Sequence, residues 1–300
     1  MKRIENITKK THALGIVTNK PRIAYDNVEY LNPSSISAGF IDHVEVDPSA
    51  IKYQFETPWR GTTPAAQDRM DRGTLMHIML LQPERLATDV ARWPAGKRRA
   101  CAEWTEFVAS SGNKLIICQE DFDQVAAAFN VLRFNRNLTE LLADLDAEVA
   151  IFSQDHGLYV KGLIDAVTRP RENPAGSVTR KMIDIKTTEA GFSERAIEST
   201  IRNFHYREKM AAYRRWYMQE DPTKVNIECY DVFINMVPPY GIRVMDFTTM
   251  AIKWGEQRID EALDAVSECV RLNDWPVFYA SNGVMVESWE TEETEMQPNV

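Results

Sequence analysis

The stretch VTRKMIDIKTT, residues 178 to 188, decides the fold, together with the run YVKGLIDAV, residues 159 to 167. The apolar content and length of both runs predict strands. In an extended chain Asp184 and Lys186 leave the same face, while the two isoleucines beside them point into a core. A carboxylate and an amine are therefore expected on one pocket wall.

A second carboxylate, Asp165, lies near the end of the earlier run. The connection to residue 178 contains Pro170, Pro174 and Gly176, which suit a hairpin-like link and bring both carboxylates and the lysine together. Such a pair can hold a hard cation such as Mg2+, and the lysine can orient water or steady a phosphate. Taken alone, an Asp-x-Lys pair is more often a solvated ion pair on a strand face than a catalytic pair.

Further motifs follow in a fixed order. Gly162-x-x-Asp165, the segment IDIKT at 183 to 187, and then Tyr206 and Tyr213 on a following helix resemble the PD-(D/E)xK nuclease superfamily in its RecB-like branch. The resemblance implies an α/β (α+β) fold with a restriction-endonuclease-like core, in which helices flank a mixed central sheet.

An upstream helix narrows the resemblance. Residues 72 to 84, RGTLMHIMLLQPE, are similar to the Gly-x-x-x-His-x-x-x-Leu-x-Pro helix of RecE-type, exodeoxyribonuclease VIII-like, exonucleases. The similarity extends over residues 37 to 279, although the chain has Asp-Pro-Ser at 47 to 49 where the family usually has Ser-Pro.

The resemblance also assigns site residues. It implies two Mg2+ ions held by His77, Asp165 and Asp184, with the carbonyl of Ile185 as an extra ligand and Lys186 positioning the nucleophile. Since imidazole is a softer ligand than carboxylate, Mn2+ is expected to substitute for Mg2+. For Glu148, on a strand over 148 to 152, a second-shell role is as consistent as direct metal contact. Without the motif, His77 reads as an ordinary core histidine.

DNA contacts are expected on the helix from 206 to 217, whose superfamily counterpart touches the DNA backbone beside the active site. This chain has Lys209 where the family has Gln, and a core aromatic stripe would show the same spacing. A basic turn near residue 97 is a second candidate, or a solvated loop. The expected DNA-binding residues are Tyr206, Arg207, Lys209, Tyr213, Arg214, Lys97, Arg98 and Arg99.

Composition sets the outer limits. The 300 residues are 44% hydrophobic and 26% charged, with a net charge of -9, so DNA contact requires a local basic surface. The four cysteines form no Cys-x-x-Cys pair, which argues against a zinc or iron–sulfur site. No apolar run approaches a membrane span and no signal-peptide pattern is seen, so a cytoplasmic protein is expected. The expected parts are an N-terminal arm (1–35), one nuclease domain (36–280) and an acidic, flexible tail (281–300).

The remaining pattern predicts helices over residues 67–81, 121–142, 193–202 and 249–272, and strands over 225–236 and 241–247 joined at a Pro-Pro turn.

RecE-type similarity implies degradation of linear double-stranded DNA from the 5′ end. The remaining 3′ strand would serve a RecT-like single-strand annealing partner, a ring-shaped homo-oligomer would give processivity, and the setting would be phage or prophage recombination. A non-catalytic DNA-end-binding scaffold and another nuclease with the same core stay open. A Cas4-like enzyme would need a cysteine cluster, and a restriction endonuclease would normally add a recognition domain; the sequence has neither.

Overall fold

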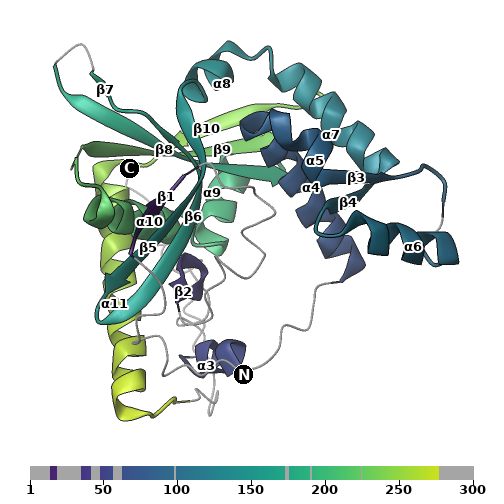
Figure 1. Cartoon of the computed structure of the whole chain (residues 1–300). Helices are drawn as coiled ribbons and strands as arrows, with labels where there is room; N and C mark the ends of the chain where they lie inside the picture. Colours follow the sequence, from purple (N-terminus) through teal and green to yellow (C-terminus); the bar gives the residue numbers. More distant parts are fainter. Residues whose placement is uncertain are drawn as a thin grey trace, which may run out of the picture.

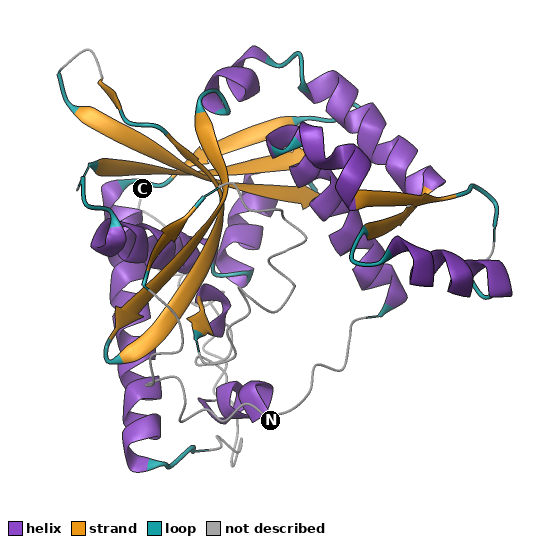
Figure 2. Cartoon of the chain, viewed as in Figure 1, coloured by secondary structure: helices purple, strands orange, loops and turns teal. Residues whose placement is uncertain are grey.

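The computed structural model describes residues 14–18, 35–41, 48–56, 63–97, 99–172, 176–189, 191–223 and 225–276. A mixed sheet forms its centre (Figures 1 and 2). The strands in spatial order are β1 (Gly15–Val17), β5 (Leu145–Asp155), β6 (Leu158–Thr168), β8 (Val178–Thr188), β9 (Asn226–Asn235) and β10 (Ile242–Asp246). Two short strands join it, β2 (Ile36–Ser37) on β6 and β7 (Arg171–Glu172) on β8.

Along the main path only the β8–β9 ladder is parallel. A parallel pair needs a long crossover, and the chain provides it with α9 (Glu194–Asn203) and α10 (Tyr206–Glu220). The β6–β8 connection is antiparallel, as predicted, and so is the β9–β10 hairpin across the Pro-Pro turn. The mixed α/β architecture predicted from the sequence is confirmed.

The other helices cover the sheet or extend from it. They are η2 (Ala38–Phe40), α3 (Pro48–Glu56), α4 (Pro64–Leu81), η3 (Pro83–Arg85), α5 (Leu86–Asp89), α6 (Ala102–Ser111), α7 (Gln119–Leu132), α8 (Arg136–Leu141) and α11 (Thr249–Leu272). Thr63 caps α4 by accepting from the Ala66 amide at 3.3 Å, and Pro64 occupies the first turn. In Figure 1, α10 and α11 lie along one side of the sheet and α4 and α7 lie at the other.

Three expectations need correction. The segment predicted as one helical region over 121–142 is broken into α7 and α8, because Asn135 starts a new helix by accepting from the Leu138 amide. A separate two-stranded parallel sheet, β3 (Val90–Trp93) with β4 (Leu115–Cys118), was not predicted. Within the expected N-terminal arm, β1 pairs with β5, so this part belongs to the sheet; most of the arm and the acidic tail lie outside the described residues.

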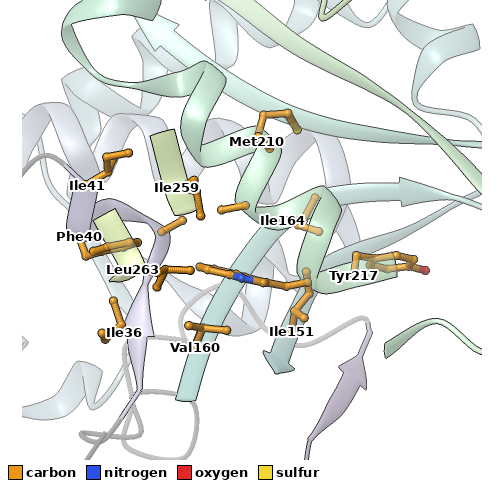
Figure 3. Packing of buried hydrophobic residues seen from close by; sticks show 14 of the residues in the cluster. Ile36, Phe40, Ile41, Ile151, Val160, Ile164, Met210, Tyr217, Ile259 and Leu263 are labelled. Carbon is orange, nitrogen blue, oxygen red and sulfur yellow. The ribbon is translucent and has the colours of Figure 1, made fainter. Parts of the chain in front are cut away.

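Two apolar cores lie on opposite sides of the sheet. On one side, side chains from η2, β5, β6, α10 and α11 converge, as Figure 3 shows for Phe40, Ile151, Met210 and Leu263. On the other side, α4 and α7 pack on apolar residues of β8 and β9. This second core contains Ile183 and Ile185, as the alternation in the sequence predicted.

The sheet forks between β6 and β8. Their ladder has only two paired positions, Ala166 with Ile183 and Val167 with Met182. From there β6 continues along β5, and β8 continues along β9. The next position on each side of the fork is a carboxylate, Asp165 on β6 and Asp184 on β8. The fork therefore exposes backbone groups of β8 that a continuous ladder would have used.

Candidate active site

Strand β8 presents the Asp-x-Lys pair on the face opposite its two core isoleucines. The ammonium of Lys186 forms an ion pair with Asp184, and it lies 4.5 Å from the ring centroid of Tyr206 on α10. A cation over an aromatic face is attracted by the ring quadrupole. The lysine is thus held between β8 and the start of α10.

Helix α4 brings His77 to the fork. Its Nε2 lies 3.1 Å from the carbonyl oxygen of Ile185, and its Nδ1 lies 3.1 Å from Oδ1 of Asp165. One turn earlier, Gly73 faces Thr187 so closely that an added Cβ would lie 3.1 Å from the threonine Oγ1. The glycine therefore lets α4 approach β8 at the distance that His77 needs.

Asp165 joins the two sides of the fork. While its Oδ1 faces His77, its Oδ2 accepts a 2.6 Å hydrogen bond from the backbone amide of Ile185. A carboxylate thus replaces the missing ladder partner of that amide, and a hydrogen bond to a charged acceptor is among the stronger kinds.

Glu148 belongs to the same cluster. The β5–β6 register pairs Ala147 with Ala166 and Val149 with Ile164, which leaves Glu148 opposite Asp165. Its backbone has φ 47°, a left-handed conformation that is uncommon for a glutamate and costs about 1–3 kcal/mol. Ligand atoms of His77, Glu148 and Asp165 all lie within 4.8 Å of one another, and all three residues are buried. The structure therefore brings Glu148 into one buried cluster with His77 and Asp165.

This donor set fits a divalent cation. When the imidazole donates from Nε2 to the Ile185 carbonyl, the neutral ring presents the lone pair of Nδ1 to two carboxylates, Asp165 at 3.1 Å and Glu148 at 3.9 Å. Three lone-pair donors facing one buried point need a proton or a cation between them. Carboxylates with one imidazole are ligands that suit Mg2+ and Mn2+.

The charged side chains at the fork act on one another's pKa values. Burial, together with the neighbouring charge of Asp165, raises the pKa of Asp184 to about 6, although Lys186 opposes the shift. Burial alone would lower the pKa of Lys186, but the surrounding carboxylates, Asp184 first, raise it above its ordinary value. The lysine therefore stays protonated at neutral pH and can act as a fixed positive charge, not as a base.

Sequence reasoning missed Asp231. It lies on β9 in register with Asp184, and its side chain is 0% exposed. Burial and the charge of Asp184 raise the pKa of Asp231 well above its ordinary value. The available signal was a carboxylate between the apolar residues 229–230 and 232–234 of the predicted strand over 225–236. The sequence alone did not say which strand it would adjoin.

The expected DNA-binding helix divides into two groups. Tyr206 lies beside Lys186, and the amine of Lys209 is 5.8 Å from the same ring. By contrast, the guanidinium of Arg207 lies 4.2 Å from the ring centroid of Trp254 on α11. The structure thus brings Tyr206 and Lys209 to the site and turns Arg207 toward α11.

The other two members of that helix also have partners within the protein. Arg214 donates to Glu256 on α11 at 3.2 Å and to the Ile227 carbonyl at 3.3 Å. Tyr213 packs on Gly162, where an added Cβ would lie 2.7 Å from its ring. The glycine of the Gly-x-x-Asp motif therefore makes room for α10 against β6.

The basic turn is engaged in local ion pairs. Lys97 contacts Glu103 at 2.7 Å, and Arg99 contacts Asp68 at 2.6 Å and donates to the sulfur of Cys118. Arg98 lies outside the described residues. DNA contact by this turn stays a prediction.

Comparison with known proteins fits this geometry. Residues 51–282 match the model of a family described as "PDDEXK-like domain of unknown function (DUF3799)". The chain belongs to this PDDEXK-like family. The PD-(D/E)xK superfamily predicted from the sequence is confirmed. A comparison with curated protein sequences found no significant match.

A solved structure shares the fold. The crystal structure of a protein named "Putative exonuclease" from Eubacterium rectale is 10% identical, with a TM-score of 0.57, and the match covers 93% of this chain and 99% of that chain. At that identity the similarity extends to the fold. Among the described residues of this PDDEXK-like chain, no helix has the length and apolarity of a membrane span.

Proposed function

We propose that this PDDEXK-like chain is a metal-dependent exodeoxyribonuclease that hydrolyses phosphodiester bonds at the ends of linear double-stranded DNA. The observation that carries the proposal is the buried cluster of His77, Glu148 and Asp165 next to the Asp184–Lys186 pair at the fork of the sheet. A merely structural fork would not require three buried side chains of metal-ligand type within 4.8 Å of one another.

The residues at the fork have different proposed roles in metal binding and in phosphate chemistry. His77, Glu148 and Asp165 would hold a divalent cation, with Asp184 as a further oxygen donor at the same fork. The Ile185 carbonyl faces Nε2 rather than Nδ1 of His77, so in place of the predicted metal contact it would orient the imidazole. When bound, Mg2+ or Mn2+ supplies Lewis acidity, which lowers the pKa of a coordinated water and offsets charge on a phosphate. Lys186 remains cationic between β8 and Tyr206, where it can orient a nucleophilic water or stabilise a phosphate oxygen.

The DNA backbone would run past the start of α10. Tyr206 adjoins Lys186, and Lys209 lies near the same tyrosine ring, so both side chains would meet a phosphate next to the one being cleaved. Arg207 and Arg214 could contact DNA only if they gave up their partners on α11, and Tyr213 only if it left its packing position on β6. We therefore place the first DNA contacts at Tyr206 and Lys209.

The finer features rest on the RecE-type resemblance of the sequence. These are digestion from the 5′ end, a 3′ single-stranded product, a RecT-like annealing partner and a ring-shaped homo-oligomer. The name of the Eubacterium rectale protein agrees with the exonuclease class. Preference for Mg2+, with Mn2+ as a substitute, follows from the oxygen-rich donor set with one imidazole.

One digestion experiment tests the proposal. Linear duplex, nicked circle and single strand, each labelled at either end where ends exist, are incubated with Mg2+, Mn2+ or EDTA. The expected result is metal-dependent release of label from linear duplex, 5′ label first, with Asp165→Asn inactive. Release of the 3′ label before the 5′ label would refute digestion from the 5′ end. Cleavage of the intact strand of the nicked circle would indicate an endonuclease. Binding to ends without cleavage would indicate a scaffold.

A further inference from the structure

Asp231 is a buried carboxylate that the roles above leave unused. It lies on β9 beside Asp184 in the parallel ladder, and it is completely buried. Neither of its oxygens has a hydrogen-bond partner among the described residues. Burying a charged group without hydrogen bonds is expensive, and native proteins satisfy nearly all buried polar atoms. A group in this state suggests a functional reason for its presence.

The nearest charged groups identify its surroundings. Asp184 and Lys186 act electrostatically on Asp231, and Asp231 in turn follows Asp184 among the charges that act on Lys186. Strand β8 offers these two side chains on the same face, and the parallel register places Asp231 next to them. The ammonium therefore has two carboxylates within electrostatic range, one in direct contact and one without other partners.

Asp184 and Asp231 are not equivalent once a metal ion is bound at the site. Asp184 is adjacent to the proposed cation position, and it interacts with Asp165 there. If Asp184 turns its oxygens to a cation, Lys186 loses its ion-pair partner while it is still largely buried. A buried cation without a counter-charge is strongly destabilised. Among the described residues, Asp231 is the next carboxylate that can take this place.

We propose that Asp231 is a positioning residue that holds Lys186 in the active site when Asp184 is engaged with a metal ion. The inference rests on the proposed nuclease function and adds a sixth residue to its site, after His77, Glu148, Asp165, Asp184 and Lys186. Asp231 touches neither substrate nor metal in this role. Once a cation offsets the charge of Asp184, that charge no longer opposes the charge of Asp231, and Asp231 supplies the second counter-charge that keeps the ammonium directed at the fork.

This role predicts opposite effects on stability and on rate. In the metal-free protein the buried carboxylate of Asp231 destabilises the fold, because it has no hydrogen-bond partner among the described residues. Asp231→Asn should therefore raise the Tm. In the working enzyme the same change should lower kcat about tenfold to a hundredfold with little change in KM, because Lys186 is no longer held. Calcium affinity, measured by calorimetry, should change by less than about threefold, since Asp231 is not a ligand. Asp231→Val provides a second neutral variant with good strand propensity.

Asp155→Asn is a matched control. Asp155 is also a buried carboxylate of the sheet, on β5, but it is fully partnered, accepting from Arg215 at 2.7 Å and from the Trp216 indole at 2.9 Å. Its loss should lower the Tm and leave kcat within about twofold of wild type when both are assayed well below their melting temperatures.

The outcomes separate the inference from the proposed function. A wild-type protein with no metal-dependent nuclease activity defeats the proposed function itself. An active wild type with equally active Asp231→Asn and Asp231→Val defeats the positioning role alone. A lowered Tm in both neutral variants would make Asp231 a structural residue, and a large loss of calcium affinity would make it a metal ligand; either result overturns the inference.

Discussion

Gly73 offers a test of how closely α4 must approach β8. A Cβ at this position would lie 3.1 Å from the Oγ1 of Thr187, so an alanine needs a shift of only a few tenths of an ångström. A valine extends two further methyl groups by about 1.5 Å, one carbon–carbon bond. The helix must then retreat on the order of 1 Å, because the contact is with a neighbouring strand rather than solvent.

The displacement reaches His77 because residues four apart lie on the same helix face. A retreat of that size would carry Nδ1 from 3.1 Å to roughly 4 Å from Asp165, outside the range for sharing a small cation. We expect Gly73→Val to reduce the initial rate on end-labelled linear duplex about a hundredfold. Calcium affinity should fall with it, and overpacking should destabilise the fold by about 1–3 kcal/mol.

Gly73→Ala should stay close to wild type, since alanine favours the helix by up to about 1 kcal/mol and this offsets the tight contact. Ala65→Val is the control, because Ala65 is exposed on the same helix and receives the same side chain. Three measurements are compared for each variant: rate, calcium binding by calorimetry, and Tm. Full activity in Gly73→Val, or an equal loss in Gly73→Ala, would refute the argument that close helix approach positions His77.

Other predictions address the site, the DNA contacts and pH. Lys186→Ala should stop cleavage but leave cation affinity largely intact; loss of affinity by calorimetry would make the amine part of metal binding. His77→Ala should lose most activity and recover part of it at high Mn2+, whereas full activity would return the residue to an ordinary core role. In Ca2+, where cleavage is suppressed, Lys209→Ala should lower the salt slope of DNA binding by roughly 0.7 to 0.9. Arg214→Ala should lower the slope less, because the Arg214 side chain is already paired with Glu256 on α11. Unchanged slopes in both variants would exclude a DNA-facing helix. Although burial opposes the shift, hydrogen bonds to two aspartates of α11 raise the pKa of His156. The positive charge of His156 therefore stabilises the fold fully below about pH 6.5, and this stabilisation is lost as the pH rises through the raised pKa. The Tm should fall less from pH 6.5 upward in His156→Gln than in the wild type, and identical slopes of Tm against pH would contradict this.

The sequence by itself determined what depends on local order. Alternation along residues 178 to 188 placed Ile183 and Ile185 in the core and Asp184 with Lys186 on the other face, and the structure confirms this arrangement. A period of two fixes the face of each side chain without knowledge of the neighbouring strands. The motif around His77 likewise predicted a helix from local pattern, and α4 is that helix.

Only the tertiary structure decided which distant residues meet. Glu148 and Asp231 become part of the fork through the β5–β6 and β8–β9 registers, which join segments far apart in the chain. Arg214 shows the reverse case, since the packing of α10 on α11 gives an intramolecular partner to a side chain that the superfamily resemblance had assigned to DNA. Register and helix packing depend on the burial of whole faces at once, so no single stretch of the sequence contains the information that sets them.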